Sequence, residues 1–417
     1  MTNITRRTLV GAGIAAPAVL SFPLSARSQT GPVRIAFIDP LSGFMAPVGD
    51  GGLKQFEFEC ERINAAGGVA GGRKLEVIGM DNKLNPQESI VQLEKAIDQG
   101  VRYIAQGNGS SVASALVDAV DKHNARNPRQ SVMFLNYAAV DPLFTNEKCS
   151  FWHFRFDADS DMKMSAMTDY IKGLTDIKRI YIIGQDYSFG KSVAESSVKM
   201  LAAKRPDIQV VGNELHPLAR VRDFTPYITK MKASGAQAVI TGNWGNDMQL
   251  LIKASSDAGF NVPYFTYYGG GLGAVAGMGK AAVGLVRQIT EWHSNIEGIG
   301  MDDIVRQFKA KHRDLDYYYY RVKVMFDMLA KTMNDTKSVE PRDVGLALEG
   351  LEMKIETGMA SMRKDNHQLI QPLYISTLAE NVKFDVDNTG LGFKTDIRID
   401  GPATSMATTC QMRRPGA

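Results

Sequence analysis

Apolar and polar positions follow a regular rhythm along most of this chain. The run VRIAFID at 33–39 has the continuous apolar character of a buried strand, and the segment 53–66 places Phe56, Cys60 and Ile63 on one helical face. Strand and helix patterns keep alternating to residue 137. Such βαβ units predict a parallel sheet with right-handed crossovers. Further strands are expected at 73–81, 101–106 and 131–137, with further helices starting at 86 and 111.

The same rhythm restarts after residue 177, which predicts a second, similar lobe. Its strands are expected at 178–184, 207–215, 236–244 and 262–270, with helices starting at 192, 223 and 247. Beyond Gly269 the pattern loosens. Helices at 317–333 and 341–351 and a strand at 371–379 remain to complete the lobes, so the chain is expected to cross between them more than once. The predicted fold class is α/β with two parallel sheets, and 417 residues with 44% hydrophobic content suffice for two cores.

The first 28 residues have the pattern of an export signal. Arg6 and Arg7 precede an uncharged stretch at 9–24, and small residues surround a possible cleavage site after Ala26 or Ser28. The paired arginines indicate the twin-arginine route to the periplasm. The apolar stretch is shorter than the roughly 20 residues that a membrane span requires.

Cysteine and charge content restrict the chemistry further. Of the three cysteines, Cys60 lies on an apolar helix face and is expected to pack as a small hydrophobe. Cys149 and Cys410 lie in irregular polar segments, and we expect them to pair and to fasten the C-terminal tail. The six histidines are scattered, so no metal site or cofactor is expected. A net charge of +3 without a long basic run gives no indication of nucleic-acid binding.

The stretch IIGQDYSFGKSV at 182–193 ends like an ATP-binding P-loop. Its glycines, Gly184 and Gly190, enclose five residues instead of four, and Asp186, Tyr187 and Phe189 occupy the place of the phosphates. Export would also remove the protein from cytosolic ATP. An ordinary strand-to-helix turn explains the stretch, and so does an aromatic lining of a ligand cleft.

The stretch IAQGNGSSVAS at 104–114 joins a strand to a helix start. It lacks the third glycine of a dinucleotide-binding turn, because Val112 stands there. The exposed N–H groups of a helix start, together with the hydroxyls of Ser110 and Ser111, suit a carboxylate. A plain serine cap of the helix explains the same residues without a ligand.

Aromatic residues recur where predicted strands end. In open parallel sheets, ligands bind in the crevice beyond the carboxyl ends of the strands, and aromatic walls bury apolar ligand surface at low entropic cost. Each of these aromatic residues alone could simply belong to the core or the surface. Because all of them follow the carboxyl end of a predicted strand, a common cleft is favoured. The residues are Phe44, Tyr137, Phe189, Trp244 and Tyr268. No catalytic motif accompanies them, such as a Gly-x-Ser-x-Gly elbow or a His-Glu-x-x-His pair.

Taken together, these stretches resemble the substrate-binding proteins of bacterial ABC importers, in the leucine/isoleucine/valine-binding family of type I periplasmic binding proteins. The resemblance covers most of residues 33–290, and INAAGGVAGGRKLEVIGMD is quite specific for the family. The other matching stretches are RIAFIDPLSGFMAPVGDGG, NKLNPQESI, SSVASA, NYAAVDP, IIGQDYSFGKS and VRDFTPYITKMKASGAQAVITGN.

The resemblance implies two Rossmann-like lobes that are joined by a three-crossover hinge and close on a ligand. The implied first lobe is 33–152 plus 291–373, and the second is 153–290 plus 374–417. In the family, a serine at a helix start holds the ligand carboxylate, which implies this role for Ser110, with Ser111 beside it. Further implied ligand contacts are Ala138, Ala139, Phe189 and Trp244.

The family's amino-acid binders carry an acid after the strand that here reads FTYYGG, to hold the ligand's ammonium group. This chain has Tyr268 there, a neutral phenol, so an aromatic or other apolar carboxylate is as compatible with the sequence as an amino acid. Asp186 and Asp247 are the alternative counter-ions.

The resulting expectation is a non-enzymatic, monomeric periplasmic protein that delivers its ligand to an ABC permease. Two alternatives remain. One is an amide or amino-acid sensor of the same fold that regulates gene expression, against which the export signal argues. The other is a hydrolase, which would convert a bound ester or amide.

Overall fold

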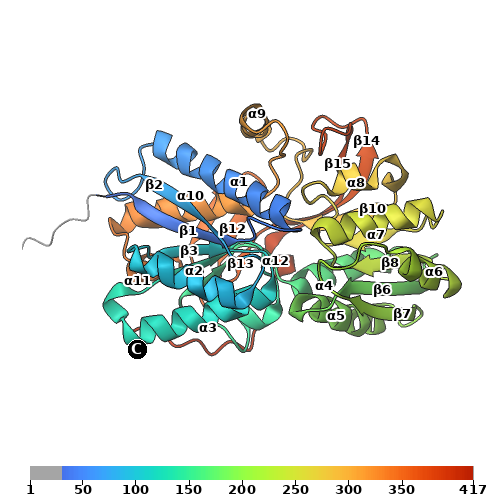
Figure 1. The fold of residues 1–417 in the computed structure, drawn as a ribbon, viewed down its shortest axis with the longest axis horizontal. Helices are drawn as coiled ribbons and strands as arrows, with labels where there is room; N and C mark the ends of the chain where they lie inside the picture. Colours follow the sequence, from blue (N-terminus) through green and yellow to red (C-terminus); the bar gives the residue numbers. More distant parts are fainter. Residues whose placement is uncertain (1–30, 417) are drawn as a thin grey trace, which may run out of the picture. The chain divides into compact units, whose positions relative to one another are not determined.

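Two sheets organise residues 31–416, the part of the chain that the computed structural model describes (Figure 1). The expected export signal at 1–28 lies outside these residues. In the first sheet all strands are parallel, in the order β2-β1-β3-β4-β5. The strands are β1 (Val33–Asp39), β2 (Leu75–Asp81), β3 (Tyr103–Gln106), β4 (Met133–Asn136) and β5 (His153–Arg155).

The second sheet repeats this topology. Strands β7-β6-β8-β9-β10 are parallel and follow the same relative order as β2-β1-β3-β4-β5, and β14 and β15 extend the sheet antiparallel. The predicted α/β fold of two lobes with parallel sheets is therefore confirmed. The strands are β6 (Arg179–Gln185), β7 (Gln209–His216), β8 (Ala238–Thr241), β9 (Tyr264–Thr266), β10 (Val286–Thr290), β14 (Leu373–Glu380) and β15 (Leu391–Ile399).

Helices cover both faces of the first sheet because successive residues of its buried strands point to opposite sides. On one side, the ring of Phe37 lies 5.0 Å from that of Phe56, which lies 5.4 Å from that of Phe326. These residues join the sheet to α1 (Ala46–Ala65) and α10 (Tyr320–Thr336). The neighbouring Ala36 and Ile38 pack on the other side, with α2 (Pro86–Asp98) and α3 (Ser110–Arg126).

The second sheet is covered in the same way. Ile182 packs in the core beneath α4 (Ser160–Lys172) and α5 (Ser188–Lys204). The adjacent Ile183 faces the core beneath α6 (Thr225–Ala233), α7 (Gly245–Asp257) and α8 (Ala274–Met278). Within residues 31–416, no helix is long and apolar enough to cross a membrane.

The chain passes between the sheets after β5, after β10 and after β13. The second passage leads to α9 (Asp302–Lys311), α10, α11 (Pro341–Leu348) and a small antiparallel sheet. That sheet consists of β11 (Glu352–Ile355), β12 (Gly358–Met362) and β13 (Leu369–Ile370). Short helices complete the described chain: η1 (Pro128–Gln130), η2 (Pro142–Thr145), η3 (Lys280–Ala282) and α12 (Gly401–Thr404).

Two segments belong to the first lobe although the sequence assigned them to the second. Residues 153–155 form β5 of the first sheet, although the boundary was expected at 152/153. The chain beyond α12 returns to the first lobe, although it was assigned to the second: Thr408 donates to the carbonyl of Thr145, and Arg342 donates to that of Pro415. Both segments are placed by a few hydrogen bonds to the first lobe. Such bonds leave no hydrophobic periodicity in the sequence, so the boundaries could not be predicted from it.

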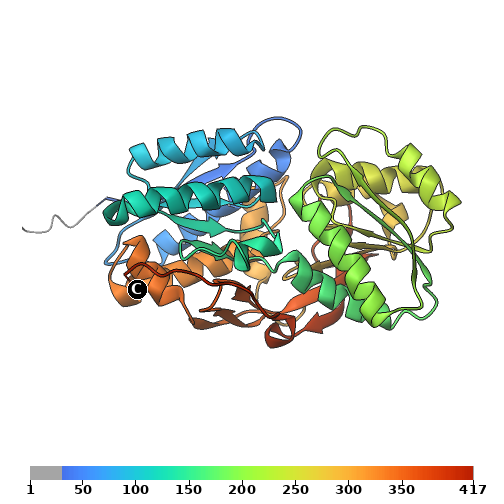
Figure 2. The same ribbon diagram turned by 90° about the horizontal axis from the view of Figure 1, so that it is seen from below.

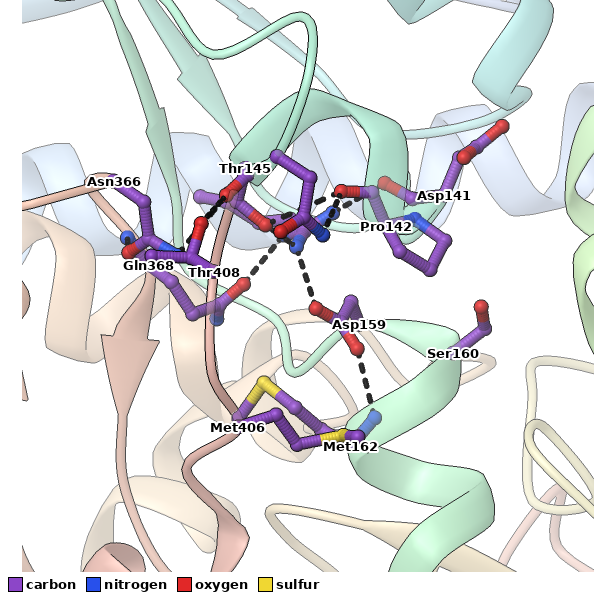
Figure 3. Close-up of polar contacts among 12 residues, drawn as sticks. Asp141, Pro142, Thr145, Asp159, Ser160, Met162, Asn366, Gln368, Met406 and Thr408 are labelled. Atoms are coloured by element: carbon purple, nitrogen blue, oxygen red, sulfur yellow. Dashed lines mark hydrogen bonds and ion pairs between the residues drawn. The ribbon is translucent and has the colours of Figure 1, made fainter. Parts of the chain in front are cut away.

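Arg155 connects these passages at the hinge. It is fully buried at the end of β5, and its Nη2 lies 2.9 Å from Asp159. Figure 3 shows Asp159 at the start of α4, which it caps by accepting from the N–H of Met162. Its Nε donates to Gln368 Oε1 at 2.6 Å, and Nη2 also contacts the hydroxyl of Thr145. One guanidinium therefore fastens the start of the first passage to Gln368, the residue before β13, from which the third passage leaves.

A disulfide fixes the tail. Cys149 and Cys410 are bonded, which confirms their predicted pairing, and Cys60 is a buried free cysteine, as expected. Figure 2 shows the C-terminal segment running along the first lobe, where Arg414 donates to Glu349 at 2.8 Å.

Two helices begin earlier than the sequence pattern predicted. Helix α1 starts at Ala46, within the expected loop, and α5 starts at Ser188 instead of 192. The Gly-Lys-Ser run at 190–192 is therefore helical and does not wrap an anion as a P-loop does. A Cβ at Gly190 would lie 1.8 Å from the carbonyl oxygen of Gln185, so glycine is required there by close approach to the strand.

Candidate binding cavity

A cavity lies where the two lobes meet, beyond the carboxyl ends of the parallel strands. Its lining includes Gly107 after β3, Ala138 after β4, Trp244 after β8 and Tyr268 after β9. The empty space between the lining atoms is about 500 Å³, part of it open to solvent. Both sheets thus contribute to the same crevice, at the place where open α/β sheets bind ligands.

Four long helices begin at the cavity. The first turns of α1, α3, α5 and α7 supply Val48, Ser110, Phe189 and Gly245 to its lining. Each helix start carries unpaired N–H groups and the positive end of the helix dipole. Because four such ends converge from both lobes, the field in the cavity favours an anion.

The start of α3 is held in place by a buried carboxylate beneath it. Asp39, at the end of β1, accepts hydrogen bonds from the N–H groups of Gly107 and Asn108 at 3.2 and 3.0 Å and from the hydroxyl of Tyr137 at 2.5 Å. Burial raises the pKa of Asp39 to about 7, against the lowering effect of these hydrogen bonds. Ser110, by contrast, lines the cavity, and its side-chain hydroxyl makes no hydrogen bond within residues 31–416.

Aromatic rings form much of the remaining wall. The indole N–H of Trp244 donates to the hydroxyl of Tyr187 at 2.8 Å, and the ring of Phe189 packs against those of Tyr187 and Tyr268 at 5.9 and 6.1 Å. These contacts fix the rings in the second lobe. Tyr318 and Tyr319 of the first lobe, 4.8 Å apart, also line the cavity.

A buried cluster of four charges lies at the hinge behind this wall. Arg321 of α10 donates from Nη1 to Glu291 at 2.6 Å, and its Nε lies 3.5 Å from Asp157. Lys163 of α4 lies 2.7 Å from the other oxygen of Asp157. Asp157 follows β5 and Glu291 follows β10, so the two acids lie in passages between the lobes and the two bases lie in the lobes themselves.

Arg321 is the member of the cluster that reaches the cavity. It is 1% exposed and lines the cavity, and its Nε also donates to the carbonyl of Tyr137 at 2.5 Å. Burial alone would lower the pKa of Arg321, but Asp157 and Glu291 raise it well above its usual value. Within residues 31–416, its Nη2 has no hydrogen-bond partner, and neither has the buried hydroxyl of Tyr318.

Six of the nine residues proposed from the sequence line the cavity, and three do not. Those in the lining are Ser110, Ala138, Ala139, Phe189, Trp244 and Tyr268. Ser111 is exposed on α3, and Tyr137 is buried below the lining and bonds Asp39. Phe44 lies under the guanidinium of Arg222, 3.9 Å from its centre. Ser110 and Ser111 point in different directions because the helix turns by about 100° per residue, so the side chain of Ser111 points away from the cavity.

The two acids considered as counter-ions for an ammonium group are both outside the lining. Asp186 is exposed and pairs with Lys191 at 3.4 Å. Asp247 is buried and accepts hydrogen bonds from Gln185 and the N–H of Ala219. Among the described lining residues there is no acidic side chain, and Arg321 is the charged one.

Tyr187 lines the cavity, as the cleft-lining interpretation of its stretch predicted. Tyr318, Tyr319 and Arg321 were not expected there from the sequence. They belong to a run of four tyrosines and an arginine at 317–321, which has the pattern of the start of an amphipathic helix. The run of tyrosines followed by an arginine was the available signal in the sequence. Its local pattern does not indicate which sheet or cavity these side chains contact in the folded protein.

The family model for "periplasmic binding protein" matches residues 32–383. This chain belongs to the periplasmic binding protein family. The matched range includes all the cavity residues described above, so this periplasmic binding protein has its cavity within the part of the chain shared with the family.

Curated relatives of this periplasmic binding protein agree with that assignment. It is 29% identical over 418 residues to Leu/Ile/Val-binding protein homolog 4 of Brucella abortus, covering 98% of this chain and 99% of the relative. It is 23% identical over 328 residues to the leucine-, isoleucine-, valine-, threonine- and alanine-binding protein of Pseudomonas aeruginosa, covering 78% and 84%.

Solved structures share the fold. The leucine-, isoleucine-, valine-, threonine- and alanine-binding protein of Brucella ovis, in a closed conformation, superposes with a TM-score of 0.81 at 28% identity, covering 92% of this chain and 100% of that one. A solute-binding protein of Rhodopseudomonas palustris in complex with 3,4-dihydroxybenzoic acid gives a TM-score of 0.74 at 18% identity, covering 89% and 98%. The latter likeness is one of fold.

Proposed function

We propose that this periplasmic binding protein is the exported solute-binding component of an ABC importer. It captures an amino acid or a small apolar or aromatic carboxylate in the cavity between its lobes, delivers it unchanged to the membrane permease, and acts as a monomer in the periplasm. The observation that carries the proposal is the convergence of four helix starts, from both lobes, on one aromatic-walled cavity. The curated relatives are named for aliphatic amino acids, and one fold neighbour is named with an aromatic acid.

Ser110 is the proposed carboxylate-binding residue. Ser110 lines the cavity at the start of a 17-residue helix whose dipole favours an anion, and no described residue hydrogen-bonds its hydroxyl. Ala138 and Ala139 are small enough to let the ligand approach the backbone, and Phe189, Trp244 and Tyr268 enclose its apolar part.

Closure of the lobes is the proposed mechanism of capture. A ligand in the cavity touches the first lobe at α3 and the second at α5 and α7 only when the lobes are together. Its affinity is therefore greater for the closed form, and binding shifts the population toward it. The polar passages at the hinge allow the lobes to rotate while Arg155 keeps the passages joined.

A thermal-shift screen of the mature protein against amino acids and aromatic and aliphatic acids tests this function. A ligand that binds only the folded form raises the melting temperature. Mass spectrometry of the ligand released by denaturation is expected to return the compound that was added. A converted product would establish a hydrolase instead, and a screen in which no acid or amino acid binds would contradict the proposal.

A further inference from the structure

The charge arrangement of the cavity restricts the class of solute. Arg321 is the charged residue of the described lining, and no acidic side chain lies beside it. The acids nearest to it, Asp157 and Glu291, are engaged by Arg321 and Lys163. An ammonium group on the ligand would therefore be buried beside a cation and four positive helix ends without a counter-ion, which is strongly unfavourable.

In addition to the start of α3, the site has two buried hydrogen-bond donors that could bind a ligand. Arg321 and Tyr318 line the cavity, and Nη2 of the arginine and the hydroxyl of the tyrosine are buried without a hydrogen-bond partner within residues 31–416. A buried donor without a partner is unfavourable, and more so when it is charged. Two such donors on neighbouring residues are consistent with a site whose acceptor comes from outside the protein.

The guanidinium is oriented before any ligand arrives. Nε is held by the carbonyl of Tyr137, Nη1 by Glu291, and the plane lies over the ring of Tyr319, 4.9 Å from its centre. Nη2 is the nitrogen that these contacts leave for a ligand. A preorganised guanidinium of this kind favours an oxygen anion and loses little entropy on binding it.

We propose that the cargo is an acid with two oxygen-bearing ends and no ammonium group: one carboxylate at Ser110 and the start of α3, and a second acceptor, preferably another carboxylate, at Arg321 and Tyr318. This inference rests on the proposed binding function and narrows its solute class. Arg321 becomes the residue that determines specificity, because it distinguishes two-ended acids from amino acids and from acids with one polar end.

Probes that share one ring and differ at one end test the inference by titration calorimetry. They are benzoate, benzene-1,4-dicarboxylate and 4-(aminomethyl)benzoate, with hexanoate and hexanedioate as the aliphatic pair. The two-ended acid is expected to bind at least about tenfold more tightly than the one-ended acid of the same body, a difference of about 1.4 kcal/mol. The aminomethyl compound is expected to bind more weakly than benzoate.

Two variants connect the preference to the proposed donors. Tyr318→Phe removes a hydroxyl that makes no hydrogen bond to any described residue, so the melting temperature should stay the same while the advantage of the diacid falls severalfold. Arg321→Lys keeps the positive charge but cannot engage Glu291, Tyr137 and a ligand together, and it should abolish most of the advantage. Tyr227→Phe, which alters a tyrosine outside the cavity, is the control and should leave the preference unchanged.

The outcomes separate this inference from the function beneath it. If one-ended and two-ended acids bind equally, or the aminomethyl compound binds as tightly as the diacid, the inference is wrong and the binding function stands. A diacid preference that persists in Tyr318→Phe and Arg321→Lys also overturns it. If no acid of either series binds, the proposed function fails together with the inference.

Discussion

Arg321 Nη1 donates to Glu291 Oε1 at 2.6 Å, and each of the two residues is 1% exposed. The arginine belongs to a helix of the first lobe, and the glutamate lies in the passage that leaves the second sheet after β10. Two buried charges are costly to desolvate, and their mutual attraction offsets that cost only in good geometry. The hinge and the cavity are therefore parts of one electrostatic unit, because the same guanidinium belongs to both.

Breaking this pair should destabilise the protein. Glu291→Gln leaves Arg321 buried with a weakened set of partners, and we expect a loss of about 3 kcal/mol in the free energy of unfolding. Urea denaturation of the variant and the wild type measures it. Glu352→Gln, an exposed site on β11, is the matched control and should change stability by less than about 0.5 kcal/mol. Equal stability of the two variants would show that the pair contributes nothing.

Ser110 and Ser111 offer a test of the carboxylate site with adjacent residues. Ser110→Ala should weaken the binding of a carboxylate by about 1–3 kcal/mol, because it removes a hydroxyl that donates to the ligand. Ser111→Ala removes the same group from the exposed side of α3 and should leave affinity unchanged. Titration calorimetry with any acid identified by the screen compares them. An effect of the same size at both positions would remove Ser110 from the site.

Asp39 should make stability depend on pH. Burial raises its folded-state pKa to about 7 from 3.8, so the folded protein favours the protonated form. The contribution to stability is complete below pH 4 and is lost as pH rises from about 4 to 7, to an extent on the order of 4 kcal/mol. The side chain in Asp39→Asn cannot ionise. As pH rises over this range, the wild type should therefore lose stability relative to the variant. Parallel urea-denaturation profiles at pH 4 to 8 would contradict the prediction.

Phe44 should contribute to closure of the lobes even though it lies outside the cavity lining. Its ring lies 3.9 Å from the guanidinium of Arg222, and its carbonyl accepts from Asn246 at 2.8 Å, both from the second lobe. Arg222→Ala should weaken ligand binding about two- to fivefold, which corresponds to an exposed cation–π contact of about 0.5–1 kcal/mol. Arg220→Ala, a nearby exposed arginine, is the control. Unchanged affinity in Arg222→Ala would exclude a role for this contact.

The disulfide between Cys149 and Cys410 should stabilise the tail against the first lobe. Replacing both cysteines by serine is expected to lower the free energy of unfolding by about 2–4 kcal/mol. Peptide mapping of the native wild type without reductant should find this pair linked and Cys60 free, with Cys60 resistant to alkylation because burial raises the pKa of its thiol. A reductant should then destabilise the wild type but not the double variant. If it affects both equally, the bond is not the cause.

Several features of the fold could be predicted from local sequence alone. The strands at 33–39 and 178–184 were placed within a residue of their ends, because buried parallel strands are continuous apolar runs. The helix predicted to start at 86 does begin there, and the Asn85 side chain caps it by accepting from the N–H of Glu88. Helix α1 was predicted too short, since its first turn is rich in glycine and is stabilised by packing that no local pattern records.

The sequence by itself determined the two strand–helix series, and with them the ends of the strands where a ligand site could form. Four cavity residues, Ser110, Phe189, Trp244 and Tyr268, followed from that topology, and Ala138 and Ala139 followed from the family resemblance. Periodicity is a local property, so it can be read along the chain. Only the tertiary structure decided that Arg321 lies at the cavity, that Ser111 and Tyr137 lie outside its lining, and that no acid of the described chain lines it. These facts depend on segments more than 100 residues apart meeting at a hinge, and the charge of a side chain does not indicate which buried partner it will meet.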